Sequence, residues 1–237
     1  MLKNKNYLYN KLSIIIPVLN EEKNIKKLIF LLKKYLKNFR YEIIFVDDNS
    51  TDNTRAIIKN YFSRNIKYYL RTKNKDLTLS CFLGIEKSKY KNLIIMDSDL
   101  QHHPRYLPKI IHFYFKKKFD FVVAVRNFNE DLGIGIVRKF SSIFLSYTFN
   151  YFLGYRISDP MSGFFIFKKS IYYKYKKFLF GKGWKILADL VYNKEVFFIK
   201  ELKIKFLKRS ENKSKMNLKV LINIIRLFIF KFRILKF

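Results

Sequence analysis

Two carboxylates separated by one residue follow an apolar segment in the middle of the chain, and their spacing indicates metal chemistry. Residues 91–96 have the composition of a short buried strand, and Asp97 and Asp99 come directly after it. Carboxylates are costly to remove from water, so such a pair at a strand end favours a bound divalent cation, Mg²⁺ or Mn²⁺. Gln101 adds a third side-chain oxygen two residues later. Because these cations share their coordination with phosphates, we expect chemistry on a nucleotide-activated substrate.

Polar residues also follow the other strands that the first half of the chain predicts. The predicted strands cover residues 12–16, 42–46, 66–70 and 91–96, and amphipathic helices separate them. Strands that alternate with helices indicate a parallel sheet, which binds ligands at the carboxyl ends of its strands. The polar segments that we expect to meet there are residues 17–21, 47–52, 71–76 and 97–101.

The second half of the chain continues this α/β pattern. It predicts helices over residues 104–117, 136–152 and 184–193, and strands or extended segments over residues 120–125, 163–167 and 196–206. No internal repeat or low-complexity linker interrupts the pattern. We therefore predict one catalytic domain over residues 12–216, with an extension over residues 1–11 before it and a basic apolar tail over residues 217–237 after it.

Basic residues in the second half would suit a second phosphate. Arg126 follows a predicted strand, and Arg138 and Ser142 are four residues apart on a predicted helix, so they share one face. Arg209 and Lys215 belong to a basic loop that contains Ser and Asn. Cations of this kind around a metal–diphosphate centre suit a reaction between two phosphorylated substrates.

Two further segments have more than one interpretation. Residues 159–163 form a predicted tight turn, in which Asp159 either faces an acceptor or orients a basic residue, and spacing alone does not choose. His102 and His103 suggest a zinc ligand pair, but no second His or Cys cluster has ligand spacing. We therefore favour histidines that pack or form hydrogen bonds near the site.

The formal net charge of +31 is compatible with a nucleic acid or an anionic membrane surface as partner. The tail over residues 217–237 is apolar but contains several Lys and Arg residues. We expect it to lie on an anionic leaflet as an amphipathic segment, and the alternative is a tail packed on the domain or on another subunit. No N-terminal signal region and no transmembrane span are apparent, and the single cysteine, Cys81, is typical of a reducing compartment. We predict a cytoplasmic protein, peripherally attached to the membrane.

Four motifs, in order and at plausible spacing, resemble family 2 glycosyltransferases, and among these the polyprenol-phosphate mannose synthases of the dolichol type. The motifs are Ser13-Ile-Ile-Ile-Pro17-x-x-Asn20-Glu21, Val46-Asp-Asp-Asn-Ser-x-Asp52, Asp97-x-Asp99-x-Gln101-His-x-Pro104 and Asp159-Pro-x-Ser-Gly163. The resemblance extends over about residues 12–216. It implies a GT-A fold, which is a Rossmann-like, mostly parallel sheet flanked by helices. It also implies inverting transfer of a sugar from a nucleotide-sugar donor to a polyprenyl phosphate acceptor.

The resemblance further implies a role for individual residues. The implied donor-nucleotide-binding residues are Pro17, Leu19, Glu21, Val46, Asp47, Asp48, Asp97, Ser98, Arg209 and Lys215. Asp97, Asp99 and Gln101 would hold the metal. Arg126, Arg138 and Ser142 would bind the acceptor phosphate, and Asp99, Arg126 and Arg138 would be the catalytic residues.

The chain departs from the family pattern at three places. Asp76 stands where relatives usually have a glycine, Leu19 replaces a frequent aromatic residue, and the tail is too short and too charged for the paired membrane spans common among relatives. Transfer of another sugar, for example from UDP-glucose, or transfer to a non-lipid acceptor is the main alternative. A basic nucleic-acid-binding protein is a remote one, because it has no use for acids at strand ends, so we expect no nucleic-acid partner. The sequence does not predict the oligomeric state.

Overall fold

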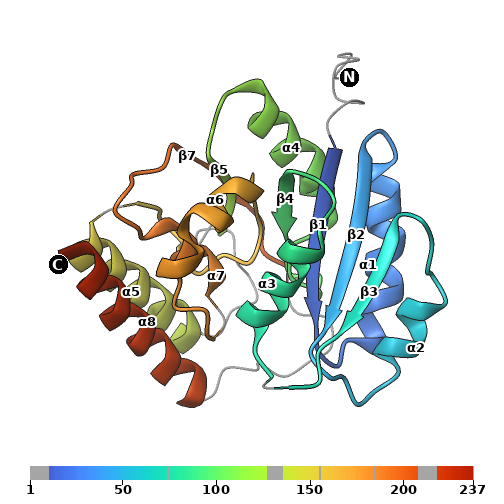
Figure 1. Cartoon of the computed structure of the whole chain (residues 1–237), viewed down its shortest axis with the longest axis horizontal. Coiled ribbons are helices and arrows are strands. Elements are labelled where there is room, and N and C mark those ends of the chain that lie inside the picture. Colours follow the sequence, from blue (N-terminus) through green and yellow to red (C-terminus); the bar gives the residue numbers. More distant parts are fainter. Residues whose placement is uncertain are drawn as a thin grey trace.

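Seven strands form one sheet in the part of the chain that the structure describes (Figure 1). The structure, a computed structural model, describes residues 11–73, 75–126, 136–154, 156–183, 185–207 and 218–236, without the side chains of residues 136–144 and 218–221. The strands are β1 Lys11–Val18, β2 Arg40–Asp47, β3 Ile66–Leu70, β4 Asn92–Ile95, β5 Phe121–Arg126, β6 Phe165–Lys168 and β7 Ile199–Ile204. Their order across the sheet is β3-β2-β1-β4-β6-β5-β7.

The sheet is parallel except at β6, which runs antiparallel to β4 and β5. The predicted mostly parallel α/β sheet is therefore confirmed, and the reversal of β6 is an addition to the prediction. This reversal has a consequence for the site. The turn that precedes β6 lies at the same edge of the sheet as the carboxyl ends of β4 and β5.

Helices cover both faces of the sheet. They are α1 Glu22–Leu36, α2 Thr54–Lys59, α3 Leu77–Lys87, α4 Leu107–Lys116, α5 Ile136–Leu153, α6 Lys169–Tyr175, α7 Ile186–Val191 and α8 Leu218–Lys236. Residues of α1, α2 and α4 pack into one hydrophobic cluster, and residues of α3, α6 and α7 pack into another. Successive residues of β1 divide between the two clusters, Ile14 and Ile16 in the first and Ile15 in the second, as the period of a strand requires.

The C-terminal helix α8 packs against the rest of the protein along one face. Ile224 and Leu227 are buried in a third cluster with Phe149 of α5 and Tyr192, which follows α7. Figure 1 shows α5 and α8 side by side, on the opposite side of the molecule from α1 and α2. The tail is thus a helix docked on the domain by one face. Within the described residues, no helix combines the length and the apolar character that crossing a membrane requires.

Candidate active site at the carboxyl edge of the sheet

The polar segments that follow the parallel strands meet at one edge of the sheet, as predicted. Pro17 at the end of β1 is in register with Val46 of β2, and Val18 is in register with Asp47. The backbone N–H of Asp48 donates to Val18 O over 2.9 Å, and that of Arg71 donates to Asp47 O over 2.8 Å. In Figure 1 this edge lies at the lower end of β1 and β2.

Backbone strain is concentrated in the loops at this edge. Among the described residues, the non-glycine residues with positive φ are Asn20 (53°), Asn49 (65°) and Leu100 (61°). They lie in the loops that follow β1, β2 and β4 respectively. Asparagine tolerates the left-handed region, but a leucine there is uncommon and costs about 1–2 kcal/mol. Strain of this kind is typical of sites whose geometry matters for function.

Asp97 and Asp99 differ in their access to solvent. The Asp97 side chain is 32% exposed, whereas Asp99 is 6% exposed and its Oδ1 accepts a hydrogen bond from the backbone N–H of Gln101 over 3.1 Å. Gly163 lies against the Asp97 carboxylate so closely that a Cβ at this position would overlap all three carboxyl atoms. Because Gly163 has no side chain, the Asp97 carboxylate can occupy this position. Carboxylate oxygens are the ligands that a hard divalent cation prefers.

Gln101, in the loop after β4, contacts Leu207, the last residue that the structure describes before residue 218. Its carbonyl oxygen accepts from Leu207 N over 3.1 Å, and its Nε2 lies 3.4 Å from Leu207 O. Leu207 directly precedes the segment that contains Arg209 and Lys215, both of which lie outside the described residues. The structure therefore gives Gln101 a structural contact, and its predicted role as a metal ligand stays a prediction.

The two neighbouring histidines have packing and capping roles, in line with the interpretation favoured from the sequence. The buried His102 ring packs edge-on against Phe164 and Phe206, and its Nδ1 lies 3.4 Å from Oδ2 of Asp97. The Nδ1 atom of His103 accepts from Arg105 N over 3.0 Å, at the start of the short 3₁₀ helix Pro104–Tyr106. The His102 ring therefore lies beside the Asp97 carboxylate.

Asp47 and Asp48, at the end of β2, have different partners. The fully buried Asp47 accepts from Ser50 N over 2.8 Å and from the Tyr68 hydroxyl over 2.8 Å. Asp48 forms an ion pair with Arg71, with Nη1 2.5 Å from Oδ1. Burial raises the pKa of Asp48 above its ordinary value, and the charge of Arg71 opposes that shift. Arg71 begins the segment over residues 71–76 that was predicted to lie at this edge, but its pairing with Asp48 was not predicted.

The first loop of the edge is held mainly by hydrogen bonds to the second. Glu21 is buried, its N–H donates to Thr54 Oγ1 over 2.7 Å, and its carboxylate accepts from Asn24 Nδ2 over 2.8 Å. Asn20 N–H donates to Ser50 Oγ over 3.0 Å. These hydrogen bonds join the loop after β1, which contains Leu19 and directly follows Pro17 and Val18 of the strand, to the segment after β2.

The turn before β6 positions a basic residue. Asp159 is 1% exposed, and its Oδ2 lies 3.3 Å from Nε of Arg126 at the end of β5. The Arg126 guanidinium also lies over the Phe206 ring, 4.8 Å from its centre. Of the two interpretations left open for Asp159, the structure supports the one in which this acid orients a basic residue. Arg138 and Ser142 lie on α5, but their side chains are outside the description.

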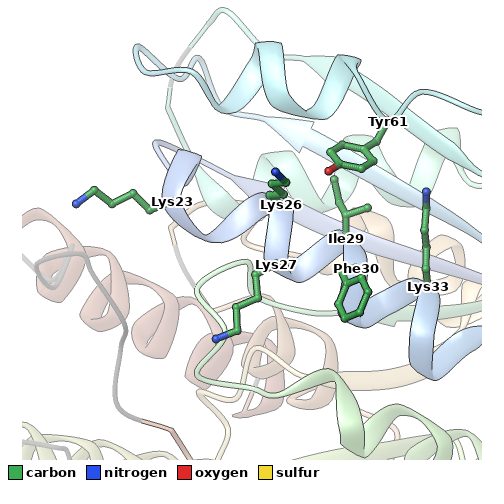
Figure 2. Close-up of a pocket in the computed structure, with 7 residues that line it drawn as sticks. All are labelled: Lys23, Lys26, Lys27, Ile29, Phe30, Lys33 and Tyr61. Carbon is green, nitrogen blue, oxygen red and sulfur yellow. The ribbon is translucent and has the colours of Figure 1, made fainter.

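A surface groove elsewhere does not belong to this site. It is lined by Tyr61 and by α1 residues that include Lys23, Lys27 and Lys33. Figure 2 shows that Lys23 and Lys27 point in different directions, away from Tyr61, so these two ammonium groups do not converge on one anion. None of the predicted site residues lines this groove.

Comparisons with known proteins agree with the resemblance drawn from the motifs. The family described as Glycosyl transferase family 2 matches residues 13–176. A dolichol-phosphate mannosyltransferase of Pyrococcus furiosus is 28% identical over 232 residues, which cover 91% of this chain and 62% of the relative. A putative glycosyltransferase of Bacillus subtilis, CsbB, is 37% identical over 124 residues, which cover 51% of this chain and 37% of the relative. The chain therefore spans less than two thirds of the length of these curated relatives.

A solved structure of similar fold comes from a bacterial enzyme. Glucosyl-3-phosphoglycerate synthase of Mycobacterium tuberculosis, in complex with UDP, superposes with a TM-score of 0.73 at 16% identity, over 95% of this chain and 81% of the other. The same enzyme was crystallised with Mn²⁺, UDP and glucosyl-3-phosphoglycerate, with a TM-score of 0.69 at 16% identity, over 93% and 78% of the two chains. At these identities the likeness concerns the fold, which agrees with the predicted GT-A architecture.

Proposed function

Because the chain belongs to glycosyl transferase family 2, we propose that it transfers a sugar with inversion, mannose from GDP-mannose, to a polyprenyl monophosphate. The proposal is carried by one observation about the turn over residues 159–163. At one end of the turn Gly163 contacts the Asp97 carboxylate, and at the other end Asp159 pairs with Arg126. A group suited to a cation and a group suited to a phosphate are thus held by one turn, as a reaction between two anions requires.

The proposed metal ligands are Asp97 and Asp99, with Gln101 beside them. Within the described residues, no group of three or more acidic, histidine or cysteine side chains gathers in a way that could hold an ion. Water and the donor diphosphate would therefore complete the coordination of Mg²⁺ or Mn²⁺. When bound, the cation would neutralise the charge of the departing diphosphate. The presence of Mn²⁺ and UDP in the M. tuberculosis complex supports a divalent cation as the cofactor.

The donor nucleotide would bind at the ends of β1, β2 and β4 and in the loops that follow them. The residues proposed to contact it are Pro17, Leu19, Glu21, Val46, Asp47, Asp48, Asp97 and Ser98. Their common place at one edge of the sheet supports the proposal, since open α/β sheets bind nucleotides there. Arg209 and Lys215 are proposed to close on the donor on the basis of the resemblance alone.

The acceptor phosphate would bind Arg126, with Arg138 and Ser142 of α5. Asp159 would fix the guanidinium of Arg126, and Phe206 would limit its movement from one face. A phosphate monoester is already ionised at neutral pH, so its oxygen attacks the anomeric carbon without a strong general base. The contribution of the protein is to hold the two anions in line and to exclude other geometries.

A lipid acceptor is supported by an apolar surface that α5 and α8 share. Tyr147 and Tyr151 of α5 are 64% and 69% exposed, and Ile225 and Ile229 of α8 are 49% and 47% exposed. The ring of Phe152, on α5, contacts that of Phe228 on α8, so the exposed apolar surface continues from one helix to the other. The exposed Arg226 and Arg233 of α8 neighbour the isoleucines on the helix. Apolar side chains with flanking cations suit an anionic membrane surface, so we propose peripheral attachment to the cytoplasmic face of a membrane.

A second donor class is favoured by a specific observation. The M. tuberculosis enzyme of similar fold was crystallised with UDP-glucose and a phosphoglycerate, so a UDP-sugar and a non-lipid phosphate acceptor are the alternative substrates. Asp97, Asp99 and Arg126 would have the same roles with either combination of donor and acceptor. The difference would lie in the nucleoside-binding loops and in the use of the α5–α8 surface.

The proposal is tested by incubating the full chain with radiolabelled GDP-mannose or UDP-glucose, a polyprenyl phosphate and Mg²⁺ or Mn²⁺. We expect label from GDP-mannose to enter the organic phase. Label from UDP-glucose alone would mean that the donor is UDP-glucose and not GDP-mannose. Absence of label in the organic phase with both donors would contradict a lipid acceptor.

A further inference from the structure

A lysine of the C-terminal helix is fully buried and ion-paired. Lys231 of α8 places Nζ 2.9 Å from Oδ1 of Asp189 on α7, and the same ammonium donates to the carbonyl oxygen of Phe178 over 3.0 Å. Asn193 Oδ1 lies 3.5 Å away. Burial lowers the pKa of Lys231, and the charge of Asp189 opposes that shift. A buried ion pair seldom adds net stability, so we consider a role for this pair other than stabilising the fold.

The pair holds one end of the loop over residues 178–183. Asp189 accepts hydrogen bonds from the backbone N–H groups of Phe180 and Gly181, both over 2.9 Å. Phe180 also packs against Phe230 of α8, with ring centres 5.5 Å apart. The loop is therefore attached to α8 both directly and through Asp189.

The other end of the loop contacts the start of α3, close to the carboxyl edge of the sheet. Gly183 N–H donates to Oδ2 of Asp76 over 2.6 Å, and Gly183 O accepts from Thr78 N over 3.0 Å. A Cβ at Gly183 would lie 3.2 Å from the Asn223 Cβ of α8, and Gly183 has a φ of +94°. Gly183 thus fits between α8 on one side and the start of α3 on the other.

Asp76 continues the chain of contacts to the proposed nucleotide site. Its Oδ1 accepts from Leu79 N over 3.1 Å, which caps α3, and its carbonyl oxygen accepts from Nη1 of Arg71 over 2.9 Å. The same Nη1 forms the ion pair with Asp48. Contacts through Arg71 and Asp76 therefore connect Asp48 to the loop over residues 178–183, which packs against α8.

We propose that Lys231 is a positioning residue for the donor nucleotide, acting through Asp189, the loop over residues 178–183, Asp76 and Arg71 on Asp48. The inference rests on the proposed function, because it takes the edge that contains Asp48 as the nucleotide site. It makes the C-terminal helix part of the catalytic unit. Binding of a nucleotide at the edge and ordering of α8 are then linked, and each stabilises the other.

The first test compares nucleotide binding by two variants of the full chain. Lys231→Met removes the buried charge, and Lys116→Met removes an exposed lysine of α4 as a matched control. GDP and UDP, each with Mn²⁺, are titrated by calorimetry. We expect Lys231→Met to bind the nucleotide about tenfold more weakly, within the range of typical coupling between sites, and Lys116→Met to bind it as the unmodified chain does. Equal affinity in a folded Lys231→Met variant would overturn the inference.

The second test uses the unmodified chain and so does not depend on how Lys231→Met folds. Hydrogen exchange is measured with and without the nucleotide and Mn²⁺. We expect slower exchange at Gly183 and in α8 around Lys231, which lies away from the edge itself. Protection confined to residues 17–21, 47–52 and 97–101 would overturn the inference and leave the proposed function standing. Absence of binding by both nucleotides to the unmodified chain would contradict both proposals.

Discussion

Gly163 lies directly against the carboxylate of Asp97, and this contact joins two motifs that are far apart in the sequence. A Cβ at Gly163 would overlap all three carboxyl atoms of Asp97. The contact arises because β6 runs antiparallel to β4, which brings the turn before β6 to the carboxyl end of β4. The position of the first acid at the site therefore depends on a residue without a side chain.

Gly163→Ala should displace Asp97 and weaken metal binding while the fold is kept. The backbone φ of Gly163 lies outside the left-handed region, so alanine is compatible with the local conformation and the collision with Asp97 is the main effect. We expect Mn²⁺ binding in the presence of GDP or UDP to weaken about tenfold, which corresponds to about 1.4 kcal/mol. Gly154→Ala is the control, since a Cβ there meets nothing within 4 Å although its φ is +83°. Unchanged Mn²⁺ affinity in Gly163→Ala would contradict this account of the contact.

Asp159→Asn should destabilise the protein and disturb Arg126. The substitution leaves Arg126, whose side chain is 10% exposed, without its counter-charge. Loss of one partner of a buried pair costs about 3 kcal/mol in the free energy of unfolding. Denaturant unfolding followed by circular dichroism measures this loss. In the double variant Asp159→Asn/Arg126→Met, we expect a loss smaller than the sum of the single losses, and strict additivity would show that the pair does not interact.

Tyr68 should ionise only at very high pH. Burial, followed by its hydrogen bond to Asp47, raises the pKa of Tyr68 to about 12. The folded pKa lies above the ordinary value near 10, so the stabilising contribution is fully present below about pH 10 and is lost as pH rises through about 12. The difference in tyrosinate absorbance between the unmodified chain and Tyr68→Phe should have its midpoint near the upper value. A midpoint close to 10 would contradict the burial and the bond.

Charge placed on the exposed face of α8 should weaken membrane attachment. Ile225→Glu/Ile229→Glu adds two acids to the surface proposed to meet an anionic leaflet, and both positions are about half exposed, so the fold should tolerate them. Co-sedimentation with vesicles that contain anionic lipid should fall by about tenfold or more, because both apolar contact and charge attraction are lost. Phe30→Glu, at an exposed position of α1, is the control. Equal sedimentation of the three proteins would contradict a role for this surface.

Much of the site could be predicted because the pattern of strands and helices determines which loops meet. The acids after residues 46 and 96 follow parallel strands, and parallel strands end at one edge of a sheet. The predicted convergence of these loops is therefore confirmed by the register of β1, β2 and β4. The helix predicted between the first two strands is α1, and its residues Ile25, Leu28 and Leu32, which follow a helical spacing, are all buried.

Other features could not be predicted from the sequence, because they depend on contacts between elements that are distant along the chain. The direction of β6 leaves no trace in its apolar residues, since Phe165 and Phe167 are buried in either direction. The sequence does not distinguish Lys231 from the other basic residues of the tail. Its burial beside Asp189 depends on the packing of α8 next to α7. The pairing of Arg71 with Asp48 depends on the neighbouring places of β2 and β3.

Asp99→Asn tests most directly whether Asp99 belongs to a metal site at which a sugar leaves its nucleotide. Asp120→Asn makes the same change directly before β5, at the opposite edge of the sheet, where the carboxylate accepts from Phe198 N. Sugar transfer from GDP-mannose or UDP-glucose is measured for both variants across a range of Mn²⁺ and Mg²⁺ concentrations. We expect Asp99→Asn to lose metal-dependent transfer and Asp120→Asn to retain it. Full metal-dependent transfer by Asp99→Asn would contradict the account.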